Sequence, residues 1–162
     1  MQRPVMFFAL LLITSASFGQ GSGRIPPDNR QPIPVTKSER NLMLTEMREF
    51  LHGFHSIQYA LSRKDMKALA ITAKPMGPLL DRLPASLREK FPEEFTQLAV
   101  AQNEAFQALA RIGEKNGDVS AALEQTAEVL TYCSGCHDSY RFEVPDPKPL
   151  AGGGGKRRRA GN

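Results

Sequence analysis

The residues best suited to chemistry lie close together near the C-terminal end of the chain. Its two cysteines, Cys133 and Cys136, are three positions apart, and His137 follows directly. On a helix, residues three or four positions apart share one face, so both thiols and the imidazole would point the same way. Two sulfurs at this spacing can bond the two vinyl groups of one porphyrin while the adjoining imidazole ligates its iron. The C-x-x-C-H pattern therefore predicts one covalently attached haem c.

Three other uses of the same residues stay open at the level of sequence. A redox-active C-x-x-C belongs at the N-terminus of a helix that follows a strand, whereas these cysteines fall near the end of a predicted helix. A zinc site would need a fourth ligand with its own matching spacing, and His52 and His55 are remote in the sequence. A structural disulfide between Cys133 and Cys136 would leave His137 without a role.

The segments that must position this motif have apolar residues at helical spacing. Thr36 and Glu39 form a capping box that predicts the start of a helix of about 27 residues. Asp65 can cap a second helix, which Pro75 and Pro78 must kink or end.

Two further helices follow in the sequence. The third is predicted to begin near Pro92 and to end at Gly117, and Asp118 caps the fourth, which carries the C-x-x-C-H motif. The chain is 7% aromatic and has no Trp. It shows no internal repeat, and no segment of useful length in which apolar and polar residues alternate as in a strand. The fold prediction is therefore all-α: an antiparallel up-down-up-down four-helix bundle enclosing one haem.

The N-terminal end differs from this middle part. Arg3 and nine consecutive apolar residues, followed by small residues, predict a secretory signal peptide over 1–19 and export to the periplasm. The apolar run is less than half of the roughly 20 residues that cross a bilayer, so no stable membrane span is expected after signal cleavage. Prolines predict an extended linker over 20–37, which would confine the packed haem domain to 38–143.

The C-terminal segment 144–162 is rich in proline and glycine, which predicts a disordered tail. The four basic residues 156–159 carry four positive charges, which equals the formal net charge of +4 for the whole chain. The basic pI therefore describes the tail rather than the domain. This run is either a solvated tail or a site for an acidic partner or anionic lipid headgroups. No nucleic-acid partner is expected, because no aromatic residues interleave with the basic ones.

The motif and its surroundings resemble a known family. The string CSGCHDSYRF places Tyr140 and Arg141 after a C-x-x-C-H on the last predicted helix, as in the cytochrome c-prime family, the class II c-type cytochromes. The resemblance covers roughly residues 38–142. It implies an up-down-up-down bundle, an exported haem protein that transfers electrons or binds a gas, and commonly a homodimer.

The resemblance also directs attention to the sixth coordination position of the iron. Some family members leave it open beneath an apolar lid, and others fill it with a Met from the first helix. Met47 is predicted as this ligand, because it lies in the middle of the apolar stripe and near the family's distal position. Met43, one turn away, and His55, at the edge of the buried face, remain alternatives, whereas His52 is expected to be solvated.

Arg141 is a candidate for binding the cofactor through its charge. It falls four residues after His137, so on a continuous helix it could pair with a haem propionate. The alternative is a solvated cation at the end of the helix, where it would suit the helix dipole.

Three classes of function can be ranked for these residues. The first is an electron carrier that exchanges single electrons with redox partner proteins, and the second binds a small gas such as nitric oxide or carbon monoxide at open iron. The third, an enzyme, is not expected, because it would need a general acid or base over the distal face and His55 is only loosely placed for that role.

Overall fold

The computed structural model describes residues 27–146. The predicted signal peptide over 1–19 and the basic residues 156–159 lie outside the described residues. Within 27–146, none of the helices combines the length and the apolar character that crossing a membrane requires.

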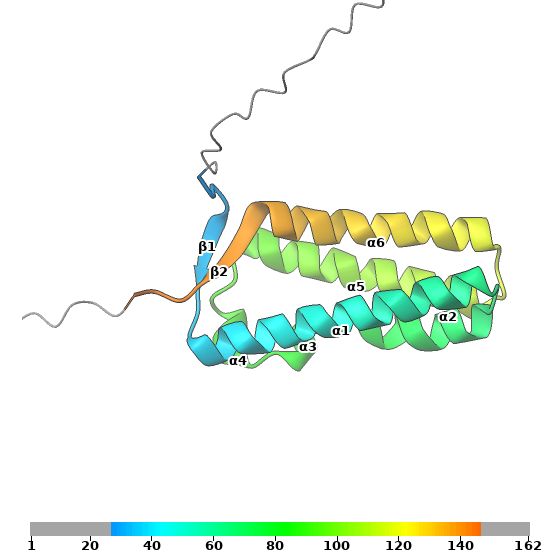
Figure 1. Cartoon of the computed structure of the whole chain (residues 1–162), viewed down its shortest axis with the longest axis horizontal. Helices are drawn as coiled ribbons and strands as arrows, with labels where there is room; N and C mark the ends of the chain where they lie inside the picture. The colour runs from blue at the N-terminus through cyan, green and yellow to red at the C-terminus, as the bar shows by residue number, and fades with distance from the viewer. Residues whose placement is uncertain (1–26, 147–162) are drawn as a thin grey trace, which may run out of the picture.

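Helices lying side by side form the body of the molecule (Figure 1). Contacts join the helices α1, α2, α5 and α6 in this order, and α6 also contacts α1. Along the chain these four helices alternate in direction (Figure 1). Their bounds are α1 Lys37–Ser62, α2 Met66–Ala73, α5 Glu93–Glu114 and α6 Val119–Ser139. The prediction of an all-α helical bundle is confirmed.

The second helix of the bundle is short, because prolines interrupt it as predicted. After α2 the chain forms the 3-10 turn η1 (Lys74–Met76), which includes Pro75, and then the short helices α3 (Leu79–Arg82) and α4 (Ala85–Arg88). A proline lacks the backbone N–H that a continuing α-helix needs. Of these short segments, η1 and α3 contact α5.

The predicted helix starts are confirmed by their caps. The backbone N–H of Glu39 donates to the Thr36 hydroxyl at 3.2 Å, and the N–H of Thr36 donates to the Glu39 carboxylate at 2.7 Å. Asp65 accepts from the N–H of Ala68 at 2.9 Å, and Asp118 caps α6 in the same manner. Each cap satisfies backbone donors that the first helical turn leaves free.

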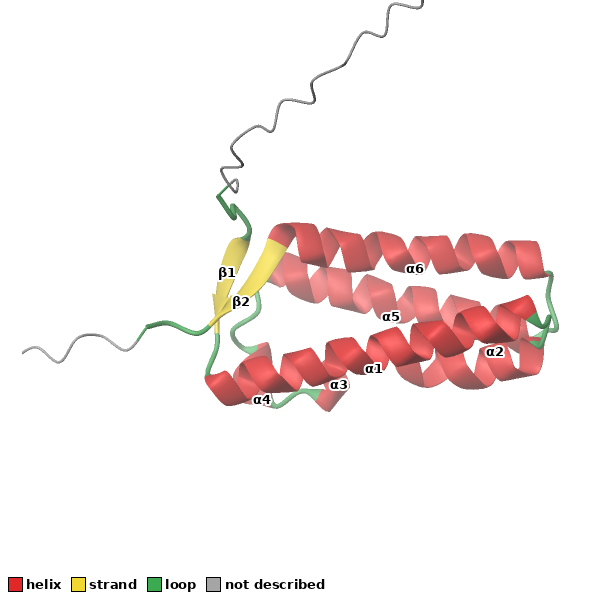
Figure 2. Ribbon diagram, viewed as in Figure 1, coloured by secondary structure: helices red, strands yellow, loops and turns green. Residues whose placement is uncertain are grey.

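A small sheet at one end of the bundle was not predicted. Strands β1 (Gln31–Pro34) and β2 (Tyr140–Glu143) pair in parallel, so the segment before α1 lies beside the segment after α6 (Figure 2). Prolines at every second position of β1 leave the intervening residues free to pair, and the N–H of Val35 donates to the carbonyl of Glu143 at 2.9 Å. The prolines are tolerated because both strands of a two-stranded sheet are edge strands.

The packed structure therefore begins earlier than predicted. Ile33 is 1% exposed and Val35 is 3% exposed, and both join a core cluster that includes Met43 on α1. The prediction of a linker over 20–37, with packing only from residue 38, is corrected for these residues. Proline density indicated an extended backbone, but an extended backbone can also be a strand once a partner strand lies beside it.

Truncating Ile33 should measure how much this segment contributes to stability. We expect Ile33→Ala to lower the free energy of unfolding by about 2–5 kcal/mol, because it deletes a buried side chain and leaves a cavity. The matched control is Ile71→Ala, since Ile71 on α2 is 66% exposed and should change stability by less than about 0.5 kcal/mol. Denaturant titration of both variants gives the comparison. Equal, small effects would show that the segment does not contribute to the core.

Candidate functional site

A cavity of about 570 Å³ opens among α1, α5, α6 and strand β2. It is lined mainly by apolar side chains, including Phe50, Phe95 and Phe106. The residues that the sequence analysis assigned to cofactor binding all border it: Met47, Cys133, Cys136, His137 and Arg141. The fold thus brings together residues from the first and last helices that lie far apart in the sequence.

The motif itself lies on the last turns of α6. Cys133 and Cys136 are half-buried, and neither forms a disulfide. His137 is an exposed residue that still borders the cavity. The helix ends at Ser139, where the N–H of Tyr140 donates to the carbonyl of Cys136. Two thiols and an imidazole therefore face one apolar cavity from a single helix.

Burial makes both motif thiols weaker acids. It raises the pKa of the Cys136 thiol to about 11, and burial also raises the pKa of Cys133. A redox-active C-x-x-C needs the opposite shift, because the thiolate is the nucleophile. For a zinc site, no group of three or more His, Cys, Asp or Glu side chains within 27–146 is placed to hold a metal ion. The surroundings thus fit neutral thiols in an apolar pocket.

Thiol alkylation of the haem-free chain tests this description. Because burial disfavours the Cys136 thiolate, we expect its reaction with iodoacetamide at pH 8 to be about tenfold or more slower than in the denatured chain. The rate should rise steeply as the pH approaches the raised pKa of about 11. Peptide mass spectrometry at several pH values gives the rate for each cysteine. Faster reaction in the folded chain than in the denatured chain would indicate a redox-active thiol.

The candidates for the sixth ligand are separated by their position. Met43 and Met47 both border the cavity from α1, but Met43 is 2% exposed within the core while Met47 is half-buried. His55 is exposed and does not border the cavity, and His52 is also exposed. The structure therefore brings both methionines, and neither of these histidines, to the cavity wall.

Arg141 reaches the cavity from a different element than predicted. It lies on β2 rather than on a continuation of α6, so the helical spacing from His137 does not apply. The helix ends before it because residues from Tyr140 onward pair with β1. The guanidinium forms an ion pair with Glu143 and donates to the backbone carbonyl of Arg30 at 3.3 Å.

Arg30 is a cavity residue that the sequence analysis missed. Its guanidinium donates to the carboxylate of Asp28 at 2.9 and 2.8 Å and to the backbone carbonyl of His137 at 3.3 Å. Its hydrogen bonds hold the pKa of Asp28 at about 2, so this pair stays ionised. No sequence pattern could have found Arg30, because only the pairing of β1 with β2 brings it beside α6.

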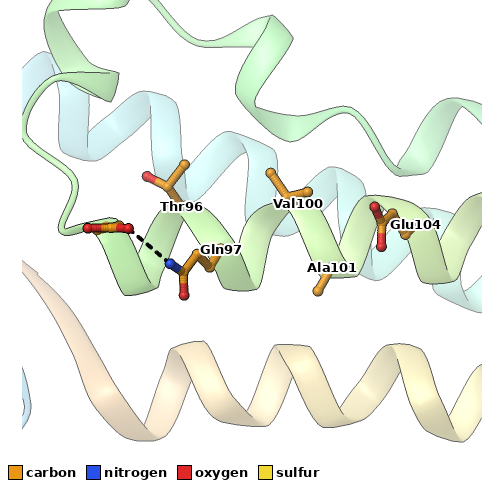
Figure 3. Close-up of a pocket in the computed structure, with 6 residues that line it drawn as sticks. Thr96, Gln97, Val100, Ala101 and Glu104 are labelled. Atoms are coloured by element: carbon orange, nitrogen blue, oxygen red, sulfur yellow. Dashed lines mark hydrogen bonds between the residues drawn. The ribbon is translucent and has the colours of Figure 1, made fainter.

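A second, shallower depression of about 350 Å³ lies on α5 and offers no comparable set of side chains. Figure 3 shows Gln97, Val100 and Ala101 along this face of the helix. The amide of Gln97 donates to the carboxylate of Glu93 at 3.2 Å, which is the dashed line in Figure 3. Neither a thiol nor an imidazole borders this depression.

One of the three comparisons with known proteins gives a match. Residues 90–141, which include α5, α6 and the C-x-x-C-H motif, match the sequence model of the family described as Cytochrome C'. The match confirms the predicted resemblance to the cytochrome c-prime family over this part of the chain. The family implies a c-type haem protein, and its members are typically exported. Neither the curated proteins nor the solved structures that were searched gave a match.

Proposed function

We propose that this chain is an exported c-type cytochrome that holds one haem covalently and transfers single electrons between redox partner proteins. The observation that carries the proposal is the grouping of Cys133, Cys136, His137 and Met47 around one largely apolar cavity. These side chains supply two thiols, an imidazole and a thioether, which are the groups that attach and ligate haem in c-type cytochromes.

Cys133 and Cys136 would attach the group through their sulfurs. Each S–H would add across one vinyl C=C bond, so that a carbon–sulfur bond forms and the thiol hydrogen passes to the other vinyl carbon. This addition balances without an oxidant or reductant. His137 follows the second cysteine directly and would ligate the iron on the α6 side.

Haem would supply an iron that cycles between two oxidation states. The chain's part is to hold this iron in an apolar environment and to choose its ligands. Phe50, Phe95 and Phe106 border the cavity and would limit the access of water. The soft sulfur of Met47, which borders the cavity from α1, would favour the ferrous state if it ligates.

The rim of the cavity carries positive charge. Arg30, Arg40 and Arg141 all border it. Guanidinium groups form strong hydrogen bonds with carboxylates, so they suit the propionate groups of a haem. Arg141 would exchange part of its pairing with Glu143, and Arg30 part of its pairing with Asp28, for such contacts.

Gas binding is a second candidate function, and one observation favours it. The inner wall of the cavity carries a buried polar side chain, Gln102. A purely electron-transferring site has no need of a free hydrogen-bond donor at that place, whereas a bound diatomic gas has an atom that can accept one.

A redox titration of the purified, exported protein separates the two functions. A carrier should show one reversible one-electron transition, a low-spin spectrum in both states, and slow binding of carbon monoxide. A gas-binding protein should show a high-spin ferrous spectrum and bind carbon monoxide quickly. A protein without haem absorption would contradict both.

A further inference from the structure

Gln102 is an unusual member of the cavity wall. On α5 the residues that border the cavity are Phe95, Ala99, Gln102 and Phe106, which form one stripe at helical spacing. Gln102 is the polar member of this stripe and is 7% exposed. A helix face of this kind is otherwise apolar, so the carboxamide needs an explanation.

The amide of Gln102 has no protein partner among the described residues. Thr126, the other buried polar residue in 27–146, donates its hydroxyl hydrogen to the carbonyl of Ala122 at 2.7 Å, whereas Gln102 makes no side-chain hydrogen bond. Within the same residues no side-chain polar atom is sealed in protein without a partner, so the Gln102 amide must open onto space. The space that Gln102 borders is the cavity. Leaving an amide without a hydrogen-bond partner in apolar surroundings is unfavourable, and a bound ligand that accepts a hydrogen bond would remove this penalty.

The register of the helices places Gln102 at the level of Met47. The rings of Phe50 on α1 and Phe106 on α5 stack with their centroids 5.9 Å apart. Met47 precedes Phe50 by three residues, and Gln102 precedes Phe106 by four. Because α1 and α5 run in the same direction, both residues lie about one turn before the stacked pair (Figure 1).

The packing of α5 against α6 gives the position of Gln102 along the bundle relative to the C-x-x-C-H motif. Leu98 on α5 lies against Gly135, with its Cδ2 3.5 Å from the place where a Cβ on Gly135 would be. Gln102 follows Leu98 by four residues, so it lies about one turn deeper in the bundle than Gly135. Side chains on a helix tilt toward its N-terminus, which on α5 is the end near the motif.

The cationic rim excludes a haem propionate as the natural partner of Gln102. Arg30 and Arg141 border the cavity at the β1–β2 end, where carboxylates can be paired and solvated. Burying a carboxylate on the apolar inner wall instead would be costly. A small neutral molecule on the Met47 side has no such cost.

We propose that Gln102 donates a hydrogen bond from its carboxamide N–H to a diatomic gas held at the sixth coordination position on the Met47 side of the cavity. The inference rests on the proposed function, since it requires haem in this cavity. Gln102 would act as a specificity residue: it favours ligands that place a polar atom near its N–H.

The C–O stretching frequency of bound carbon monoxide tests this proposal, because a nearby donor lowers it. All proteins would carry Met47→Leu, so that carbon monoxide reaches the same position whether or not Met47 ligates. In that background Gln102→Leu should raise the stretching frequency and weaken carbon monoxide binding about two- to tenfold, as expected for one lost hydrogen bond. Thr126→Val removes a buried hydroxyl that does not border the cavity and should leave the frequency unchanged.

The outcomes separate this proposal from the one it rests on. Haem loading with an unchanged C–O frequency in Gln102→Leu would overturn the role of Gln102 and leave the proposed function intact. Absence of haem in the parent protein would overturn both. If Gln102→Leu itself fails to load haem, the Met47→Leu parent protein provides the test. The proposal predicts that its C–O stretching frequency lies below that of a haem–carbon monoxide complex in an apolar solvent. An equal or higher frequency would overturn the proposal.

Discussion

Replacing both Cys133 and Cys136 with serine is expected to abolish covalent haem attachment. Serine preserves the approximate size of the side chain but provides no thiol to add to a vinyl group. The double variant, produced with cytochrome c maturation machinery, should lose essentially all haem staining on a denaturing gel. The double variant should also unfold at a lower temperature, because the apolar cavity that both residues border would no longer hold a haem.

Ser134 offers a matched control within the same motif. It is exposed, it lies between the two cysteines, and it does not border the cavity. Ser134→Ala should therefore retain haem staining and thermal stability close to those of the parent protein. Undiminished staining of the double cysteine variant would contradict covalent attachment at these residues.

Replacing Met47 with leucine should convert a low-spin haem into a high-spin one. A thioether on the iron gives six-coordinate, low-spin haem and raises the reduction potential, because soft sulfur stabilises the ferrous state. Leucine keeps much of the volume of methionine, so we expect a packing cost below about 1.5 kcal/mol. The variant should stay folded, lose the sulfur-to-iron absorption band in the near infrared, show a lower reduction potential and bind carbon monoxide faster.

Met43→Leu is the matched control for this experiment. Both methionines lie on α1 and border the cavity, but Met43 is fully packed in the core. The Met43 variant should keep the spectrum and potential of the parent. If Met43→Leu rather than Met47→Leu changes the spectrum, the ligand is Met43. If the parent is already high-spin, gas binding becomes the better account of function.

The helices could be predicted from the sequence because their signals are local. Side chains within one turn decide a cap, so Thr36, Asp65 and Asp118 marked helix starts that the structure confirms. Apolar residues at helical spacing are less informative about burial: Leu51 on α1 is 69% exposed although it is a large apolar residue. Helical periodicity shows which face is apolar, but the neighbouring helices decide how far burial extends.

The features of the fold and of the site that could not be predicted from the sequence depend on contacts between distant segments. The pairing of β1 with β2 joins residues more than one hundred positions apart, and no local sequence pattern predicted this pairing. Arg30 enters the cavity wall only through this pairing, and Arg141 changes from a helix to a strand position because of it. Gln102 is different, because the sequence alone shows a polar residue within an apolar helical stripe. That pattern could have identified Gln102 as a candidate residue.

The most direct test of the central claim is the mass of the peptide that contains the C-x-x-C-H motif. The protein would be purified from the exported fraction of a host with cytochrome c maturation, denatured and digested. The predicted result is one haem on the peptide with Cys133 and Cys136, one per chain, retained under denaturing and reducing conditions. Recovery of that peptide at its unmodified mass, with free or disulfide-bonded cysteines, would contradict the account.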